Sequence, residues 1–522
     1  MAGAAPRAAL ATAAFCAPNR QPLTATTRHL NLELQILLPL PQPLSKTFAL
    51  LHAASPHLHL CTESDLCHPP LTPLMPPIPA IALTLVLLSS TVSASAAMLT
   101  VDVAGGGPFK TITAAIEKAN AGDTILVKPG IYRESVRPKS HLRIVSEKGP
   151  TVTSVFVEKG GRALHCDHVE DVTVEGFDFR SVLGVGKAGD GLVKLDFSSD
   201  IIVRDSYIHD AGNDADCVKV NDSRRFLLER CCVWNPAGRL DKKSFQEGMD
   251  TRVRNFEITV RGCWFFQQDG QGDTLIYCKG GCFDILWEDN IFGPSVGGGH
   301  SNVPVQSGHQ NAGDAGDYHP PYPSGRFVIR NNLFVGLKGE AAFGFQGPDT
   351  SLLYNNVFYR NETTPSLITI TDNPGTKGGP ALNLFSFNNL FVENGDKPLY
   401  RQRNAVASLR NLKTSHNLYG QPALGGDIDL KSEPGALLGR APGFVATSIP
   451  VFDFKKGPQQ IREIRAGFQL ANGSPARGVG IDPLTFTGSV HPQAVPAMSH
   501  GLEGPSKPAT WDLGLHDFTA SR

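Results

Sequence analysis

The chain lacks three features that would define its class at once. Its 522 residues include 48 Lys and Arg against 49 Asp and Glu, and a net charge of −1 gives no basis for general nucleic-acid or anionic-membrane binding. No apolar run reaches the ~18 residues that a membrane-spanning helix needs. Ten Cys are too few for a disulfide framework. Gly is abundant, at 53 residues, and with frequent Asn and Asp it predicts many tight turns.

The first hundred residues differ from the rest. Residues 1–74 are rich in Pro, Leu, Ala and His and carry few charges, which predicts a disordered or spurious leader. Within 75–96, an apolar stretch over 78–88 precedes Ala94-Ser95-Ala96, the small-x-small pattern of a signal-peptidase site. This predicts a signal peptide and a secreted protein. Because 75–96 contains no Lys or Arg, a disordered tail is the alternative.

A six-residue pattern recurs nine times from residue 174 onward. It consists of an apolar residue, any residue, a small polar pair, an apolar residue and an aromatic or apolar residue. Three occurrences are IRNNLF (329–334), LYNNVF (353–358) and SFNNLF (386–391). The fourth positions lie 24 to 42 residues apart, close to thirty in most units. A period of this length is typical of a solenoid or a propeller.

A parallel β-helix fits this repeat better than a propeller. The apolar residues alternate with period 2 between Gly-, Asn- and Asp-rich segments, so each unit consists of short strands and turns. A propeller blade needs roughly 40–45 residues, more than most units supply. We predict an all-β fold, a right-handed parallel β-helix over 97–420, with a β-sandwich as the alternative. Asn332, Asn356 and Asn389 are predicted to stack at coil corners.

Both ends of a solenoid must be covered, because unpaired strand edges are exposed there. Phe109, Ile112 and Ile116 occur at helical spacing within 109–123, which predicts an N-terminal capping helix. Residues 421–522 lose the repeat and are predicted to form an irregular C-terminal closure and tail.

Three features resemble the pectin-lyase-like superfamily of secreted right-handed parallel β-helix proteins. They are the segment GGGPFKTITAAIEKANAGDTILVKPGIYRESV (105–136), the paired-Asn coils and the FQL-x-x-GSPA ending within 468–481. The resemblance covers residues 100–480 and implies the fold. The superfamily includes lyases, hydrolases, esterases, epimerases and non-catalytic adhesins, so the fold does not choose the chemistry.

Charged residues recur about once per coil between residues 190 and 280. The cations are Lys194, Lys219, Arg252 and Lys279. Acids precede them, namely Asp190, Asp214, Asp216, Glu247, Asp250 and Asp273. Period-2 alternation turns Lys219 outward between Val218 and Val220, so the cations are predicted to stack on one outer face. The alternative is a solvated, salt-bridged face.

Such a row suits β-elimination from a uronate polymer, in which a base removes the proton beside a neutralised carboxylate. The catalytic candidates are Lys219, Arg252, Lys279 and Lys194, and the substrate-binding candidates are Glu247, Asp250 and Asp273. A lysine acts as a base only if its pKa falls, and neighbouring cations lower it. Lys219, flanked by Lys194 and Arg252, is predicted to have the most depressed pKa of the row.

Two strings, AGDGLVKL (188–195) and NDADCVKV (213–220), loosely resemble calcium-dependent pectate lyases of polysaccharide lyase family nine. The resemblance implies Ca²⁺ as a cofactor, an acidic polysaccharide as the partner and Lys279 as an alternative base. The implied calcium ligands are Asp190, Asp214 and Asp216. Cys217 departs from the family pattern by interrupting the Asp cluster.

Other functions remain open on the sequence alone. A carbohydrate esterase of the same fold would use Asp273 and Asp284, but only 11 residues separate them, less than half a coil. A non-catalytic glycan-binding or adhesive β-helix would carry the same repeats. The Cys residues within the repeats are predicted to pack as small apolar groups. The chain is expected to be a monomer.

Overall fold

The structure is a computed structural model that describes ten stretches of the chain. They are residues 96–186, 191–237, 246–268, 274–296, 303–308, 324–371, 381–403, 408–420, 424–490 and 510–515. All of them belong to one compact unit, Ser90–Arg522. The predicted leader, and the predicted signal peptide up to residue 95, lie outside the described residues. Within the described residues no helix is both long and apolar enough to cross a membrane.

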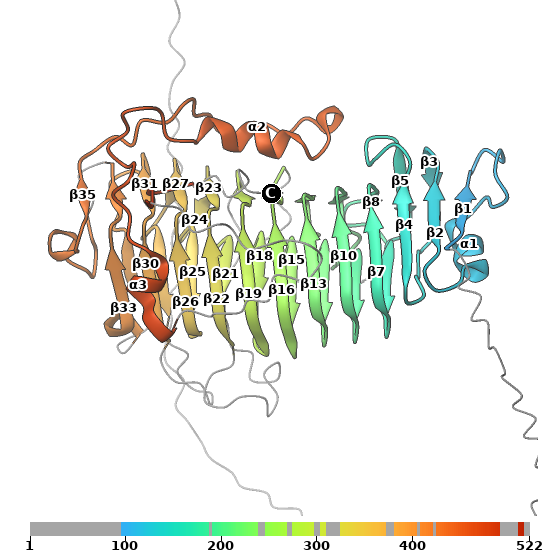
Figure 1. Ribbon diagram of the computed structural model, residues 1–522, viewed down its shortest axis with the longest axis horizontal. Coiled ribbons are helices and arrows are strands. Elements are labelled where there is room, and N and C mark those ends of the chain that lie inside the picture. The colour runs from blue at the N-terminus through green and yellow to red at the C-terminus, as the bar shows by residue number, and fades with distance from the viewer. Residues whose placement is uncertain are drawn as a thin grey trace, which may run out of the picture. The chain divides into compact units, whose positions relative to one another are not determined.

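Three parallel sheets form the body of this unit (Figure 1). The first sheet contains β1 (Met98–Val101), β2 (Thr124–Val127), β4 (Leu142–Ser146), β7 (Glu170–Glu175), β10 (Ser199–Arg204), β13 (Arg224–Glu229), β16 (Asn255–Arg261), β19 (Cys282–Glu288), β22 (Gly325–Arg330), β26 (Asp349–Tyr354), β30 (Leu382–Phe387) and β33 (Leu412–Ser415). The second contains β3 (Gly130–Tyr132), β5 (Thr153–Val157), β8 (Asp178–Ser181), β11 (Tyr207–His209), β14 (Cys232–Trp234), β17 (Trp264–Phe266), β20 (Ile291–Phe292), β23 (Leu333–Val335), β27 (Val357–Tyr359), β31 (Leu390–Val392), β34 (Leu418–Tyr419) and β35 (Leu437–Leu438).

The third sheet contains β6 (Leu164–Asp167), β9 (Val193–Asp196), β12 (Val218–Asn221), β15 (Met249–Arg252), β18 (Ile276–Cys278), β21 (Val305–Ser307), β25 (Phe343–Gln346), β29 (Ile368–Thr371) and β32 (Tyr400–Arg403). A separate pair joins β24 (Lys338–Gly339) to β28 (Glu362–Thr363). From β6 onward each coil passes through the third, first and second sheets in turn, as β9, β10 and β11 do before β12 begins the next coil. The predicted all-β parallel β-helix is confirmed.

The core lies inside the coils, where alternate side chains of each strand meet. Val218 and Val220 of β12 are fully buried, whereas Lys219 and Asn221 between and beside them are only partly buried. Seven Cys are described, all buried and unpaired, as their predicted apolar packing requires. Burial raises the pKa of Cys166 to about 12, so this thiol stays protonated.

The paired Asn residues divide two tasks between them. Asn331, the first of one pair, adopts the left-handed conformation that turns the corner, with φ of 56°. Asn332, the second, is fully buried, and its backbone N–H donates to Oδ1 of Asn356 at 2.9 Å. The ladder continues through Asn389 at 3.0 Å. The predicted stacking is confirmed, and each amide satisfies groups that the corner leaves without strand partners.

Replacing Asn356 by Ala is expected to destabilise the protein without changing its site. The N–H of Asn332 would lose its acceptor and the carbonyl of Ile329 would lose its donor. Each orphaned buried group costs roughly 1–3 kcal/mol. Urea unfolding should show this loss against Asn472→Ala, an exposed control. A loss as small as the control's would mean that the ladder contributes nothing.

Seven short helices lie outside the sheets in the described part of the chain. They are α1 (Ile112–Lys118), α2 (Gln460–Gly467), α3 (Pro483–Thr487) and the 3₁₀ helices η1 (Ser408–Asn411), η2 (Leu430–Ser432), η3 (Phe454–Lys456) and η4 (Gly488–Val490). Helix α1, N-capped by Thr111, contacts β1 and β2 and buries Ile112 and Ile116. The helix predicted within 109–123 is therefore present, on the first strands of the solenoid.

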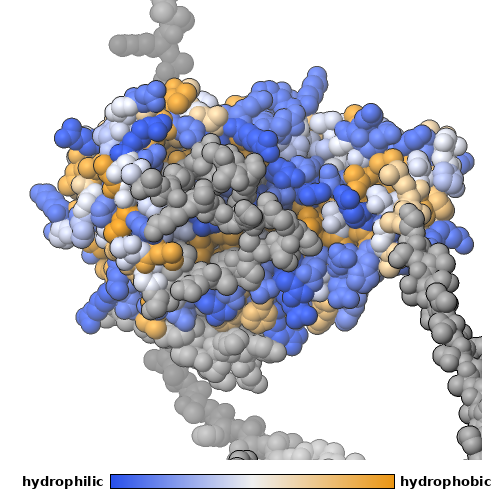
Figure 2. Space-filling model, viewed as in Figure 1, coloured by the Kyte–Doolittle hydropathy of each residue, from blue (hydrophilic) through white to orange (hydrophobic). Residues whose placement is uncertain are grey.

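The C-terminal segment does more than close the last coil. Helix α2 runs along the stack of coils (Figure 1), and Ile461 packs in the apolar cluster that contains Trp264 of the second sheet. Phe486 of α3 contacts Phe387 of the first sheet, with ring centroids 5.0 Å apart. Side chains along the edge where α2 lies are mostly hydrophilic (Figure 2). The segment thus shields apolar outer faces from water.

His209 joins this segment to the second sheet. Its ring stacks on Trp234 at 4.0 Å, lies near Phe454, and contacts Asp178 and Asp210 at 2.8 and 2.7 Å. Burial disfavours the imidazolium, but the two carboxylates outweigh burial and raise the pKa of His209.

The stability contributed by His209 should therefore depend on pH. A raised folded-state pKa gives stability that is complete below the unfolded value of ~6.5 and is lost as the pH rises through the folded value. We expect the difference in melting temperature between wild type and His209→Gln to be largest at acidic pH and to shrink on the alkaline side. A difference that does not change with pH would show that folding leaves the pKa of His209 unshifted, and a difference that grows on the alkaline side would show that folding lowers it.

Candidate functional site

Five acidic and basic side chains meet on the outer face of the third sheet. Strand β12 supplies Lys219 and β15 supplies Asp250, and pairing of the two strands places these residues side by side. Asp216 and Glu247 precede the two strands, and Lys279 follows β18. These residues come from three successive coils, which stack ~4.8 Å apart.

The side chains form a continuous hydrogen-bonded cluster. The Lys219 ammonium donates to Oδ2 of Asp216 at 2.9 Å and to Oδ2 of Asp250 at 2.8 Å. The Lys279 ammonium donates to Oε1 of Glu247 at 3.0 Å and lies 3.2 Å from Oδ2 of Asp250. The backbone N–H of Glu247 donates to Oδ1 of Asp216 at 2.8 Å. We call these five residues the Lys–carboxylate cluster.

A glycine leaves room for one of the lysines. Gly191 lies on the preceding coil, and a Cβ at this position would come within 2.7 Å of the Cβ of Lys219. Any other residue here would displace Lys219 or the backbone that carries it. The short segment from Gly191 to β9 therefore contributes to the position of Lys219.

The cluster is nearly enclosed, with Asp216 and Asp250 fully buried and Lys219 and Lys279 only 12% and 13% exposed. Burial opposes the charge of Lys219, but Asp216 and Asp250 outweigh it and raise the pKa of Lys219. Asp250 and Glu247 outweigh burial in the same way and raise the pKa of Lys279. The prediction that Lys219 has a depressed pKa is wrong, because carboxylates lie closer to it than any cation does.

The pKa values of two acids in the cluster, Glu247 and Asp250, are shifted in opposite directions. Burial raises the pKa of Glu247, and the charges of Asp216 and Asp250 raise it further. Burial also acts on Asp250, but Lys279 and Lys219 outweigh it and hold the pKa of Asp250 below its usual range. Glu247 therefore takes up a proton more readily than Asp250, which lies between two ammonium groups.

The four predicted cations do not form a single row. Lys194 lies beside Lys219 in the strand register, but its ammonium pairs with Asp196 at 3.2 Å. Arg252 lies beside Asn221, two residues farther along the strand than Lys219. The register of β15 places Asp250, rather than a cation, next to Lys219. Asp250 beside Lys219 and Asp196 beside Lys194 thus reduce the repulsion that a continuous cationic row would have.

The predicted acids separate into three groups. Asp216, a predicted calcium ligand, meets Glu247 and Asp250, which were predicted to bind substrate. Asp214 lies outside this group and accepts from Nε2 of Gln246 at 2.8 Å. Asp190 and Asp273 lie outside the described residues.

Sequence reasoning missed a second polar cluster, which lies toward the N-terminal coils of the third sheet, on β6, β9 and β12. Asp196 contacts Nε2 of His165 at 3.0 Å and accepts from Nδ2 of Asn221 at 3.0 Å. Burial opposes its charge, but these contacts and Lys194 hold the pKa of Asp196 below its usual range. The period-2 alternation of β6 and β9 could have revealed this cluster, because it turns His165 and Lys194 to the same outer face. The two residues share a register position.

Three carboxylates of the Lys–carboxylate cluster have the chemistry of a hard-cation site. One oxygen each of Asp216, Glu247 and Asp250 lies within 4.8 Å of the others. Oδ1 of Asp250 is buried and has no hydrogen-bond partner among the described residues. Ca²⁺ takes six to eight oxygen ligands, so this donor set fits part of its coordination shell. Lys219 and Lys279 compete for the same oxygens.

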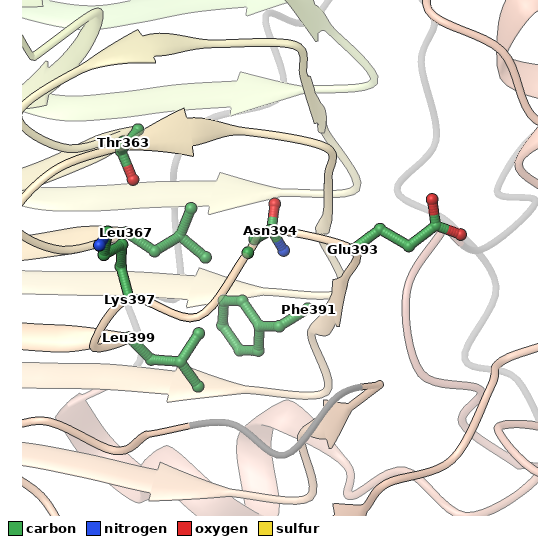
Figure 3. A pocket seen from close by; sticks show the side chains of 8 residues that line it. Thr363, Leu367, Phe391, Glu393, Asn394, Lys397 and Leu399 are labelled. Atoms are coloured by element: carbon green, nitrogen blue, oxygen red, sulfur yellow. The ribbon is translucent and has the colours of Figure 1, made fainter.

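A small cavity near the C-terminal coils is not a ligand site. Its volume is about 20 Å³, enough for a single water molecule. Figure 3 shows Leu367, Phe391 and Leu399 around it, whereas Glu393 points away.

The chain resembles solved β-helix structures only distantly. It matches no protein-family model and no curated protein in sequence. A pectate lyase shares 12% identity over 82% of this chain and 97% of that one, with a TM-score of 0.46. A rhamnogalacturonan lyase shares 13% over 61% and 87%, with a TM-score of 0.42. A pectin methylesterase from carrot shares 13% over 68% and 91%, with a TM-score of 0.26. By its own strand pairing the protein is a parallel β-helix protein, and these likenesses assign it no chemistry.

Proposed function

We propose that this protein is a secreted polysaccharide lyase that cleaves a uronate-containing polysaccharide by β-elimination. The observation that carries the proposal is the Lys–carboxylate cluster, which holds two ammonium groups against three carboxylates on the outer face of three successive coils. β-Elimination needs a cation to neutralise the uronate carboxylate and a base to remove the adjacent proton. The cluster supplies both kinds of group from strands of the third sheet and from residues next to them.

The two lysines have different roles in this proposal. Lys219 lies between the ionised carboxylates of Asp216 and Asp250 and stays protonated, so it binds and neutralises the substrate carboxylate. The pKa of Lys279 is raised too, but less than that of Lys219, because its partner Glu247 has a raised pKa and is a weaker counter-charge, and because the nearby Lys219 ammonium opposes the increase. Of the two lysines, Lys279 holds its proton less tightly, and it is the one that acts as the base in this proposal.

Asp216, Glu247 and Asp250 are the residues that would hold a Ca²⁺ ion. Bound there, the ion supplies positive charge that acidifies the proton beside the substrate carboxylate. The residues themselves orient Lys219 and Lys279 toward the outer face. Calcium dependence is part of this proposal.

One experiment tests the function. The protein, expressed as the full chain, is incubated with a panel of polyuronates with and without Ca²⁺, and the near-UV absorbance of the unsaturated product is followed. A rise in absorbance with at least one polymer is expected. New reducing ends without absorbance would indicate a hydrolase, methanol release would indicate an esterase, and binding without a product would indicate a non-catalytic glycan-binding protein. Each of these outcomes contradicts the lyase proposal.

A further inference from the structure

A long groove lies between the C-terminal segment and the solenoid, on a different face from the Lys–carboxylate cluster. Its volume is about 1200 Å³. Its floor consists of the corners between the first and second sheets on six successive coils, from Ser146 to Asp289. Its wall is the segment 455–469, which includes α2 and runs along the stack of coils (Figure 1).

The wall is anchored to the solenoid at both ends. The Tyr207 hydroxyl donates to the carbonyl of Phe454 at 2.9 Å, just before the wall begins. Near its other end, Arg465 donates to the carbonyl of Asn331 at 2.8 Å and to Asp289 at 3.2 Å. Buried Ile461 holds the middle of the wall in the apolar cluster on the second sheet. The groove is therefore a preformed feature of the fold.

The described residues that line the groove carry excess positive charge. Seven are Lys or Arg and four are Asp or Glu, although the whole chain has a net charge of −1. Every one of the four acids is paired with an arginine, for example Asp205 with Arg230 at 2.6 Å and Glu175 with Arg204 at 2.7 Å. The negative charge of the floor is thus neutralised within the protein.

Three lining cations have no such compensation. Lys148, Lys455 and Arg462 are exposed, and none makes an ion pair within the described part of the chain. Lys148 lies on the floor, at the corner between β4 and β5, and Lys455 and Arg462 lie on the wall. A linear anion in the groove would meet positive charge from both sides.

We propose that this groove binds a segment of an acidic oligosaccharide, separately from the site that cuts it. Corners repeat every ~4.8 Å along the floor, close to the length of one sugar in an extended polysaccharide. None of the described lining residues is aromatic, so the groove lacks the rings on which the bases of a nucleic acid stack. The choice of a carbohydrate over another linear anion rests on the proposed function.

The test compares two double variants in the full chain. Lys455→Glu with Arg462→Glu reverses two charges of the groove, and Lys431→Glu with Arg440→Glu makes the same change at exposed positions of the C-terminal segment outside it. Affinity for a labelled oligogalacturonate is measured by fluorescence anisotropy at low and high salt. We expect the groove variant to lose roughly tenfold or more in affinity at low salt, with a weaker salt dependence, and the control to match wild type.

Two further readings separate this proposal from the proposed function. Cleavage of a short oligogalacturonate should be unchanged in the groove variant, and its binding defect should appear even if no polymer is cleaved by any form of the protein. Equal affinity of the groove variant and the control would overturn the proposal. Binding of poly-glutamate to the wild-type groove as tightly as oligogalacturonate would also overturn it, because the ligand would then be any linear anion.

Discussion

Replacing Lys279 by Ala is expected to lower turnover of the cleaved polyuronate by at least roughly 100-fold, the usual contribution of a general base. The Lys279 ammonium lies between Glu247 and Asp250, and its Nζ is 5.0 Å from the ring centroid of Tyr277, so these neighbours fix its position. Lys219→Ala should also reduce turnover, because the substrate carboxylate would lose its cation. The measurement is the initial rate of unsaturated-product formation, with melting temperatures recorded for each variant.

Arginine variants separate the two roles. Arg keeps the positive charge but does not release its proton near neutral pH. Lys219→Arg should therefore retain more activity than Lys219→Ala, whereas Lys279→Arg should be as inactive as Lys279→Ala. Lys413→Ala, an exposed lysine on the first sheet, is the control. Wild-type rates in both Lys219→Ala and Lys279→Ala would show that the cluster is only a salt-bridged face.

Asp250→Asn is expected to cause the largest loss of stability of any single change in the cluster, roughly 3–5 kcal/mol, as when one partner of a buried ion pair is removed. Oδ2 of Asp250 contacts both ammonium groups, at 2.8 and 3.2 Å, and the residue is fully buried. The neutral amide would leave Lys219 and Lys279 with less counter-charge in a site with little water. Urea unfolding at neutral pH measures the loss.

The matched control is Asp284→Asn, which removes a carboxylate from an ion pair with the 43% exposed Arg326. Solvent screens this pair, so the loss should be at most ~1 kcal/mol. Because the folded-state pKa of Asp250 is lowered, its contribution is present above the unfolded value of ~3.9 and is lost as the pH falls through the folded value. Equal losses in the two variants would mean that the cluster is solvated.

The sequence alone was sufficient for the fold because the coil repeat is local. A strand alternates its side chains with period 2, and a corner requires a left-handed residue followed by a buried polar one. The roles of Asn331 and Asn332 are therefore set by their position in a short local pattern. The outward direction of Lys219 followed from the same alternation. These features depend on a few consecutive residues, so they can be recognised in a single sequence.

What the sequence could not determine is which side chains of different coils meet. Coils differ in length between 24 and 42 residues, so the distance along the chain does not give the register. Only the strand pairing placed Asp250 beside Lys219 and moved Arg252 two positions away. The direction of the pKa of Lys219 followed from that register, because Coulomb interactions depend on separations of a few ångströms. The groove required tertiary structure for the same reason: its wall at Lys455 and its floor at Asp205 are 250 residues apart and meet only because the C-terminal segment packs on the second sheet.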